Sequence, residues 1–93
     1  KLEKDMATVK AIKFFATWCG PCKIYGKTWN KVEKEYEGKL EFQEVDIDKD
    51  TTGLAAKYKV NDIPHTVIIK EDGTEIQETG RLNYSELTKL INE

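Results

Sequence analysis

The sequence predicts an α/β fold in which helices flank a mixed, four-stranded central sheet. Apolar, strand-like runs alternate with stripes of helical period in the order βαβα, and two further strands and a last helix follow. A helix between the first two strands is the arrangement of a parallel crossover, whereas a tight turn makes the last two strands antiparallel. The 93 residues are enough for one small domain, residues 1–93.

The first predicted strand, residues 9–16, is apolar with little alternation, as expected of a central strand that is covered on both faces. Lys13 interrupts this apolar run. Before the strand, Leu2 and Met6 lie four residues apart. Residues 1–8 therefore form either a short amphipathic helix or a frayed terminus.

A helix is predicted from residue 21 to about residue 37. Pro21 suits its first turn, where the missing N–H leaves no bond unmade, and Gly38 supplies a stop. Gly26 lies inside this helix and weakens it by about 1 kcal/mol relative to alanine. Apolar residues recur at steps of three and four and should face the sheet, namely Cys22, Tyr25, Trp29, Val32 and Tyr36.

The later elements are bounded by turn and cap signals. Asn83 and Glu86 have the spacing of a capping box at the start of the last helix, in which Leu87, Leu90 and Ile91 should pack inward. The other expected elements are a strand over residues 40–47, a short helix over residues 51–58, and strands over residues 66–69 and 74–79 joined by a turn at residues 71–73.

Cys19 and Cys22, the two cysteines of the chain, stand where the first strand ends and the first helix begins. The free N–H groups and the dipole of a helix N-terminus favour an anion, and the thiolate is the reactive form of cysteine. Two cysteines and one histidine do not complete a four-ligand zinc site within one chain, and so short a loop makes a poor structural staple. The pattern predicts reversible thiol–disulfide chemistry rather than inert, buried thiols, with Cys19 at an exposed tip and Cys22 shielded.

The stretch Trp18-Cys19-Gly20-Pro21-Cys22-Lys23 resembles the active-site signature of the thioredoxin family. Phe14-Phe15-Ala16-Thr17 runs into it, and Val45-Asp46-Ile47-Asp48, Ile63-Pro64 and Gly80 follow in the family's order. The resemblance covers the chain from about residue 9 to its end. It implies a thioredoxin-like fold and a dithiol–disulfide oxidoreductase that reduces protein disulfides.

In the implied reaction, Cys19 attacks a disulfide of the partner protein, and Cys22 then attacks the Cys19 sulfur and leaves the pair oxidised. This chemistry needs no bound cofactor and no metal. The electrons would come from a partner that resembles thioredoxin reductase. Gly20 and Pro21 would tune the redox poise of the pair, and Lys23 either helps to hold a thiolate or is an ordinary exposed lysine.

The resemblance also implies a substrate surface around the sulfurs. Trp18 would shield the sulfurs and offer an aromatic face to a protein substrate, although partial core packing is the plain alternative. Pro64 would follow a cis peptide bond and face the cysteines, with the backbone of Ile63 free to pair with an extended peptide. Gly80 would let the substrate backbone approach closely, or would serve only as a turn.

Two residues depart from the family's pattern. Lys13 occupies the place of a buried aspartate, and we expect its long stem to reach solvent, the alternative being a neutral base behind Cys22. If Lys13 does not serve, Glu44 or water would have to accept the proton of Cys22. His65 replaces a threonine after the proline, and we expect it on the far face of its strand rather than near the sulfurs, where it would titrate near neutrality.

Composition limits the remaining classes. A net charge of −2 gives no electrostatic reason to expect nucleic acid or acidic lipid as a partner, and no apolar run approaches the roughly 20 residues of a membrane span. We expect a cytoplasmic monomer, although a chain that begins at Lys1 leaves a removed leader open.

Three other functions stay open at this stage. They are a thiol oxidase or isomerase of an oxidising compartment, a binding module that uses the groove near Trp18, Ile63 and Gly80, and a glutathione-linked glutaredoxin, for which no clear basic site is visible. The reduction potential of the cysteine pair separates the first of these from a reductase, because a reductase should be strongly reducing.

Overall fold

The computed structural model describes residues 7–93, so the prediction for Leu2 and Met6 lies outside the described residues. The observed order confirms the predicted succession of strands and helices and adds the 3-10 helix η1, which was not predicted and which takes Ile47 from the end of the predicted second strand. The elements are β1 (Thr8–Phe15), α2 (Gly20–Glu35), β2 (Glu41–Asp46), the 3-10 helix η1 (Ile47–Lys49), α3 (Leu54–Lys57), β3 (His65–Lys70), β4 (Glu75–Thr79) and α4 (Tyr84–Asn92).

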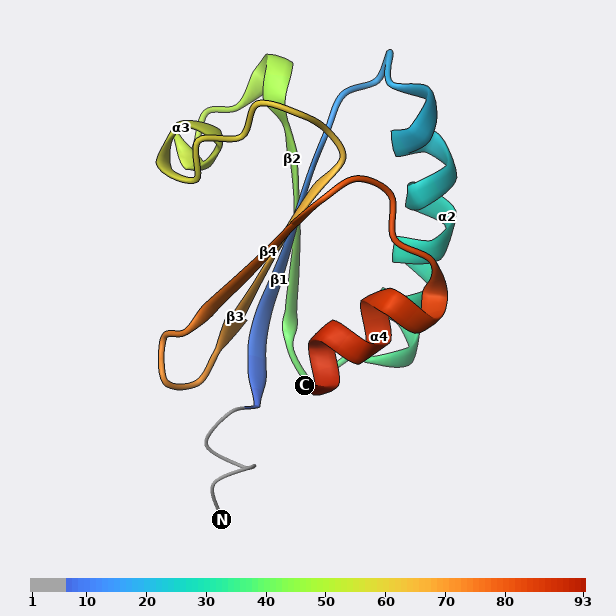
Figure 1. Cartoon of the computed structure of the whole chain (residues 1–93), viewed down its shortest axis with the longest axis vertical. Helices are drawn as coiled ribbons and strands as arrows, with labels where there is room; N and C mark the ends of the chain where they lie inside the picture. The colour runs from blue at the N-terminus through green and yellow to red at the C-terminus, as the bar shows by residue number, and fades with distance from the viewer. Residues whose placement is uncertain (1–6) are drawn as a thin grey trace.

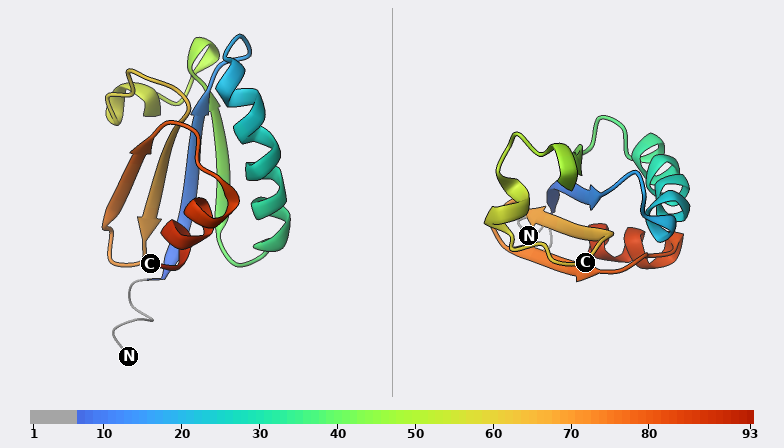
Figure 2. Two further views of the ribbon diagram at one scale, coloured as in Figure 1. Left: turned by 45° about the vertical axis from the view of Figure 1, so that its right-hand side comes forward. Right: turned by 90° about the horizontal axis from the view of Figure 1, so that it is seen from above.

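Within the described residues the four strands form one mixed sheet in the order β2-β1-β3-β4. β1 and β2 are parallel and β3 and β4 are antiparallel, as predicted, and β1 also pairs with β3 in the antiparallel sense, which was not predicted. Helices α2 and α4 cover one face of the sheet and α3 lies over the other (Figure 1). The view from above in Figure 2 shows the sheet between these two layers. β1 therefore lies inside the sheet and is covered on both sides.

The two faces of the sheet carry separate cores. The face below α2 and α4 buries Ala11, Tyr25, Trp29, Val32, Ile68, Leu87 and Ile91. The opposite face buries Ile12, Phe14, Val45, Tyr58 and Val67. Successive residues of β1 alternate between the two clusters, because side chains of a strand point to opposite faces in turn.

Helix α2 begins at Gly20 and ends at Glu35, close to the expected bounds. Its stripe is buried as predicted at Cys22, Tyr25, Trp29 and Val32, whereas Tyr36 caps the helix and is half-buried. The helix runs unbroken through Gly26.

Helix α3 is shorter than the predicted residues 51–58. The hydroxyl of Thr52 accepts a hydrogen bond from the Leu54 N–H (3.1 Å), and Asp50 accepts one from the Thr52 N–H (2.7 Å). Gly53 is left-handed, with a φ of 78°. These side-chain bonds hold residues 50–53 in turns and delay the start of the helix.

Helix α4 has the predicted capping box. The side chain of Asn83 accepts from the Glu86 N–H (2.8 Å), and the Glu86 carboxylate accepts from the Asn83 N–H (2.9 Å). Leu87 and Ile91 are buried and Leu90 is half-buried, so this helix packs its apolar side on the sheet.

At the far end of the sheet from the cysteines, Lys70 is buried at 2% exposure. Its ammonium lies within hydrogen-bond distance of a hydroxyl and of three carbonyl oxygens near the end of α4. These partners are Thr8 Oγ1 at 2.8 Å and the carbonyl oxygens of Leu90 at 3.1 Å, Ile91 at 3.2 Å and Glu93 at 3.0 Å. A cation at a helix C-terminus is favourable, and here it also satisfies carbonyls that the helix leaves free.

Candidate active site

The two cysteines form a disulfide at the junction of β1 and α2. Cys19 is the N-cap residue of α2, and its sulfur accepts the backbone N–H of Cys22 at 3.2 Å. Cys22 lies in the first turn of the helix, with Pro21 before it. The cysteine pair thus lies at the N-terminus of α2, directly after β1, where the helix dipole favours negative charge on a sulfur.

The prediction that Cys19 lies at an exposed tip is wrong for this disulfide form. Cys19 is 6% exposed and Cys22 is 4% exposed, so both sulfurs are buried. The Cys19 sulfur turns inward and lies 3.9 Å from the carbonyl oxygen of Ile63, a residue 44 positions later in the chain. The pair packs in a small cluster with Ala16, next to Ile47 and Ile63. A loop from the other half of the sequence therefore covers the pair.

The other residues of the signature lie at the surface. Trp18 is 67% exposed, and its indole N–H donates to Asp48 Oδ2 at 2.7 Å. Gly20, Pro21 and Lys23 are also exposed. The hydrogen bond fixes one edge of the Trp18 ring and leaves the rest of it open to a partner.

The Ile63–Pro64 peptide bond is cis, and Pro64 is buried. The Pro64 carbonyl accepts the Gly80 N–H at 2.7 Å, which joins the start of β3 to the residue after β4. Gly80 has a φ of 102°, a conformation that side-chain-bearing residues rarely adopt. The fold thus brings Ile63, Pro64 and Gly80 to the end of the sheet that holds the cysteines.

The favoured prediction that Lys13 reaches solvent is wrong, because the residue is only 4% exposed. Its amine lies 5.3 Å from the ring centre of Phe15 and 5.5 Å from that of Trp29, and 3.8 Å from Glu44 Oε2 on β2. Because β1 is covered on both faces, the Lys13 side chain lies between the sheet and α2 and does not reach solvent. Burial lowers the pKa of Lys13, while the charges of Glu44 and Glu33 act in the opposite direction.

His65 lies on the face of β3 turned away from α2, as expected, and its ring is 6.1 Å from that of Phe14. Nδ1 lies 2.8 Å from Thr79 Oγ1, and Nε2 lies 2.9 Å from Gln77 Oε1. Both ring nitrogens are thus occupied by side chains of β4, so the ring ties β3 to β4 and is not directed at the sulfurs.

Two residues near the site have roles that the sequence reasoning did not assign. Asp48 was noticed only as part of a family stretch, and its bond to Trp18 depends on the fold of η1 against the β1–α2 junction. Ile24 is 53% exposed in the second turn of α2. Its signal was available in the sequence, because it is an apolar residue that falls off the buried stripe of Cys22 and Tyr25.

Among residues 7–93, no group of three or more histidine, cysteine, aspartate or glutamate side chains is placed to hold a metal ion. In the same part of the chain, no helix has the length and apolar character needed to cross a bilayer. The chemistry that the arrangement itself offers is that of the sulfur pair.

Three comparisons with known proteins give concordant results. The family model named Thioredoxin matches residues 2–93. The thioredoxin of Staphylococcus aureus is 42% identical over 65 residues, which are 70% of this chain and 61% of that relative. The matched segment thus spans less than two thirds of this curated relative.

Solved structures agree with the same family. The Fasciola hepatica thioredoxin is 34% identical, with a TM-score of 0.77 over 97% of this chain and 83% of that chain. Chloroplastic thioredoxin z is 26% identical, with a TM-score of 0.79 over 97% of this chain and 79% of that chain.

Proposed function

Because the chain belongs to the thioredoxin family, we propose that it is a dithiol–disulfide oxidoreductase that reduces protein disulfides through Cys19 and Cys22. The observation that carries this proposal is the Cys19–Cys22 disulfide at the N-terminus of α2, packed against the Ile63 loop. A disulfide is opened and closed by thiolate attack on one of its sulfurs through a mixed disulfide, which is the reaction proposed for this pair.

Cys19 is the nucleophile in this proposal. Exposure does not separate the two sulfurs, since both are buried. The N-cap position does, because the Cys19 sulfur already accepts the Cys22 N–H and lies at the positive end of α2. The same contact would stabilise a Cys19 thiolate once the disulfide is reduced.

Cys22 is the resolving residue. In the first half of the reaction, the Cys19 thiolate attacks one sulfur of a substrate disulfide and releases the other as a thiolate. Cys22 then loses its proton and attacks the Cys19 sulfur, which releases the second substrate thiolate and restores the Cys19–Cys22 bond. The substrate gains two electrons and two protons, and the chain loses them.

A protein substrate would dock beside the sulfurs on main chain and exposed apolar side chains. The Ile63 carbonyl lies 3.9 Å from the Cys19 sulfur, so a peptide that pairs with Ile63 carries its own sulfur to Cys19. Trp18 and Ile24 offer exposed apolar surface, and Gly80 adds no side chain beside Pro64. Pro64 shapes the loop, while Gly20, Pro21 and Lys23 complete the α2 end of the site.

The oxidised pair must be reduced before the next cycle. We assign that step to a separate protein that resembles thioredoxin reductase and meets the same surface.

The test is a pair of serine variants with insulin as the disulfide substrate. Trapping is measured with pre-reduced variants after dithiothreitol has been removed, and turnover is measured separately with dithiothreitol as the electron source. Cys22→Ser should accumulate a covalent one-to-one adduct with insulin, visible by mass and reversed by dithiothreitol, because nothing resolves the mixed disulfide. Cys19→Ser should trap none. Both variants should reduce insulin at no more than the uncatalysed rate.

Equal trapping by the two variants would refute the assignment of roles. A Cys19→Ser protein that still binds the partners of the wild-type chain, with no turnover in either protein, would instead indicate a binding module.

A further inference from the structure

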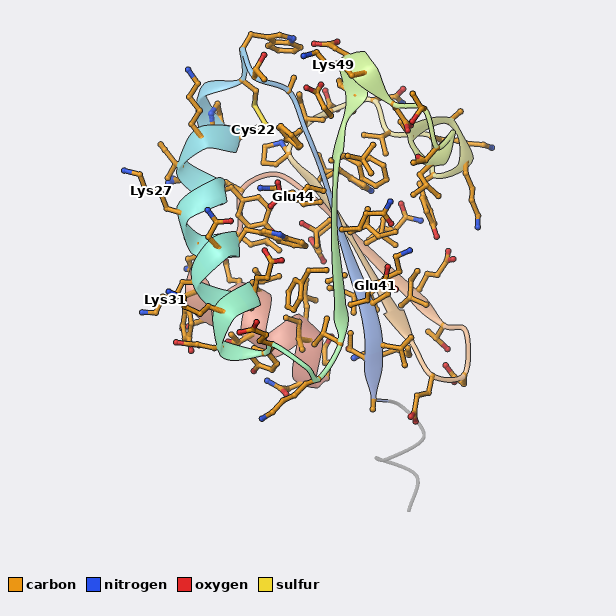
Figure 3. All side chains as sticks on the ribbon, turned by 180° about the vertical axis from the view of Figure 1, so that it is seen from behind. Cys22, Lys27, Lys31, Glu41, Glu44 and Lys49 are labelled. Atoms are coloured by element: carbon orange, nitrogen blue, oxygen red, sulfur yellow. A yellow bond between two sulfur atoms is a disulfide. The ribbon has the colours of Figure 1, made fainter. Side chains whose placement is uncertain are left out.

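Lys13 and Cys22 face one shared hollow beneath the N-terminal end of α2. The hollow measures about 330 Å³, and its lining consists of Lys13, Phe15, Ala16, Thr17, Cys22 and Lys23. In Figure 3, Glu44 lies on the α2 side of β2, below Cys22. The proposed resolving sulfur and a buried lysine thus share a space lined largely by carbon.

The charged and aromatic neighbours of Lys13 favour its ammonium form and oppose the effect of burial, which lowers the pKa of Lys13. Glu44 on β2 lies 3.8 Å from the amine, and the faces of Phe15 and Trp29 lie at distances typical of cation–π contacts. Glu33 on α2 adds a second negative charge to its field. Each of these groups favours an ammonium over a neutral amine.

The remaining groups on the elements packed against Lys13 add little opposing charge. On β3 its neighbour is Thr66, whose hydroxyl lies 2.6 Å from the Tyr25 hydroxyl. The Tyr25 phenol, whose pKa burial raises to about 12, is neutral at physiological pH and adds no charge. Lys23 lines the hollow from α2, is exposed to water, and carries the same sign as Lys13.

We propose that the ammonium group of Lys13, held behind Cys22 by Glu44, stabilises the thiolate of Cys22 and thereby promotes resolution of the mixed disulfide. The second part of this statement rests on the proposed function, and the first part does not. An opposite charge beside a thiol favours its ionised form, the more so where water is scarce.

Lys13 is not the base that takes the proton of Cys22. A charged lysine cannot accept the proton of Cys22, so that proton leaves to solvent and Lys13 keeps its own. The Cys22 sulfur then forms the bond to the Cys19 sulfur, the Cys19–substrate bond breaks, and the substrate thiolate takes up a proton. Lys13 acts on Cys22 as a fixed charge.

The test follows the Cys22 thiolate directly, by its absorbance at 240 nm, in a Cys19→Ser chain that leaves one thiol. Adding Lys13→Met keeps the length and apolar stem of the side chain and removes the charge. The titration midpoint of Cys22 should rise by about one pH unit, which is a roughly tenfold smaller thiolate fraction at pH 7. Lys13→Arg should keep the midpoint of the parent chain.

A matched control exists on the same pair of strands. Lys10 and Glu41 are register partners on β1 and β2, as are Lys13 and Glu44, and their charged atoms are also 3.8 Å apart. The Lys10 side chain is 28% exposed and that of Glu41 is 68% exposed. Lys10→Met removes the same charge from the same strand and should leave the Cys22 midpoint unchanged. Equal midpoints for Lys13→Met and Lys10→Met would overturn the proposal.

A second measurement needs no change at residue 13. In the Cys19→Ser chain, the ε-methylene NMR signals of Lys13 should shift with the same midpoint as the 240 nm absorbance. Lys13 signals that do not respond to the Cys22 titration would also overturn the proposal. Neither experiment contains a substrate, so a failure here is distinct from a failure of the insulin trapping experiment.

Discussion

Lys13 and Lys70 are both buried lysines of the central sheet, at 4% and 2% exposure, but their surroundings differ. Lys70 lies opposite Thr8, where β1 begins, and its ammonium is within hydrogen-bond distance of four oxygens. Lys13 lies five residues further along β1. Its neighbours are two aromatic faces and one carboxylate at 3.8 Å, a distance longer than a hydrogen bond.

The difference indicates that the charge of Lys70 stabilises the fold, whereas the charge of Lys13 is free to act on Cys22. The oxygens around Lys70 are already committed to it, so its charge fastens the end of α4 to the start of β1. The charge of Lys13 is compensated on one side by Glu44, which is 41% exposed, and it shares a hollow with Cys22 on the other. Burial lowers the pKa of both lysines, so burial alone does not tell the two roles apart.

The largest effect should follow removal of the structural charge. Lys70→Met removes the donor to the Thr8 hydroxyl and to the Leu90 carbonyl, whereas the Ile91 carbonyl keeps the Thr8 hydroxyl as a donor at 2.6 Å. Each buried acceptor left unsatisfied costs roughly 1–3 kcal/mol. We expect the free energy of unfolding to fall by about 3 kcal/mol in urea titrations of the oxidised protein. The thiolate midpoint of Cys22 should stay where it is.

Lys13→Met is the matched substitution for that experiment. Its stability loss should stay within about 1 kcal/mol, because Glu44 can be hydrated and a methionine packs well against Phe15 and Trp29. A loss as large as that of Lys70→Met would show that Lys13 is structural as well, and the comparison between the two lysines would fail.

Much of the fold could be predicted because the relevant signals are local. The stripe in α2 and the capping box of α4 each depend on residues within one or two helical turns. The start of α3 differs from its predicted start, because it depends on side-chain hydrogen bonds of Asp50 and Thr52 that hydrophobic periodicity does not reveal.

The site was less predictable because its key contacts are remote in sequence. The cysteine pair is visible as a motif, but the burial of Cys19 comes from the Ile63 loop, 44 residues away. The position of Lys13 was misjudged because a long stem can often reach water. Here both faces of β1 are covered, so Lys13 is buried. The sequence already predicts that this strand is central and covered on both faces, and the burial of Lys13 follows from that prediction. Lys70 has no local signal, because its partners lie at the other end of the chain.

A smaller, pH-dependent effect on stability should appear at Tyr25, which is buried on the same side of the sheet as Lys13. Its pKa is raised to about 12 from an ordinary value of 10, chiefly by burial. Between these values the unfolded chain loses the phenol proton while the folded chain keeps it, so the free energy of unfolding falls as pH rises. Raising the pH from 9 to 11 should remove about 1 kcal/mol of Tyr25-dependent stability from the oxidised protein.

Two variants isolate this contribution from that of the lysines. Tyr25→Phe should reduce the alkaline loss by about 1 kcal/mol and leave the part that comes from Tyr58 and Tyr84, whose pKa values are also raised. Thr66→Val should keep the full loss, since the Tyr25 phenol remains buried without its 2.6 Å partner. Urea titrations at pH 9 and pH 11 would compare the three proteins. An unchanged alkaline loss in Tyr25→Phe would mean that the loss comes from other groups.

The smallest effect concerns the space around Lys13. A Cβ built on Gly26 meets the Lys13 amine at 3.8 Å, an ordinary contact with the end of a flexible side chain. Alanine has a higher helix propensity than glycine, and this contact does not offset that advantage. Gly26→Ala should therefore raise the free energy of unfolding by up to about 1 kcal/mol. The gain should be equal in the Lys13→Met background, because the methyl group needs nothing from the amine. A loss of stability that disappears in the double variant would show that Lys13 is tightly held, as Lys70 is, and not merely compensated by Glu44.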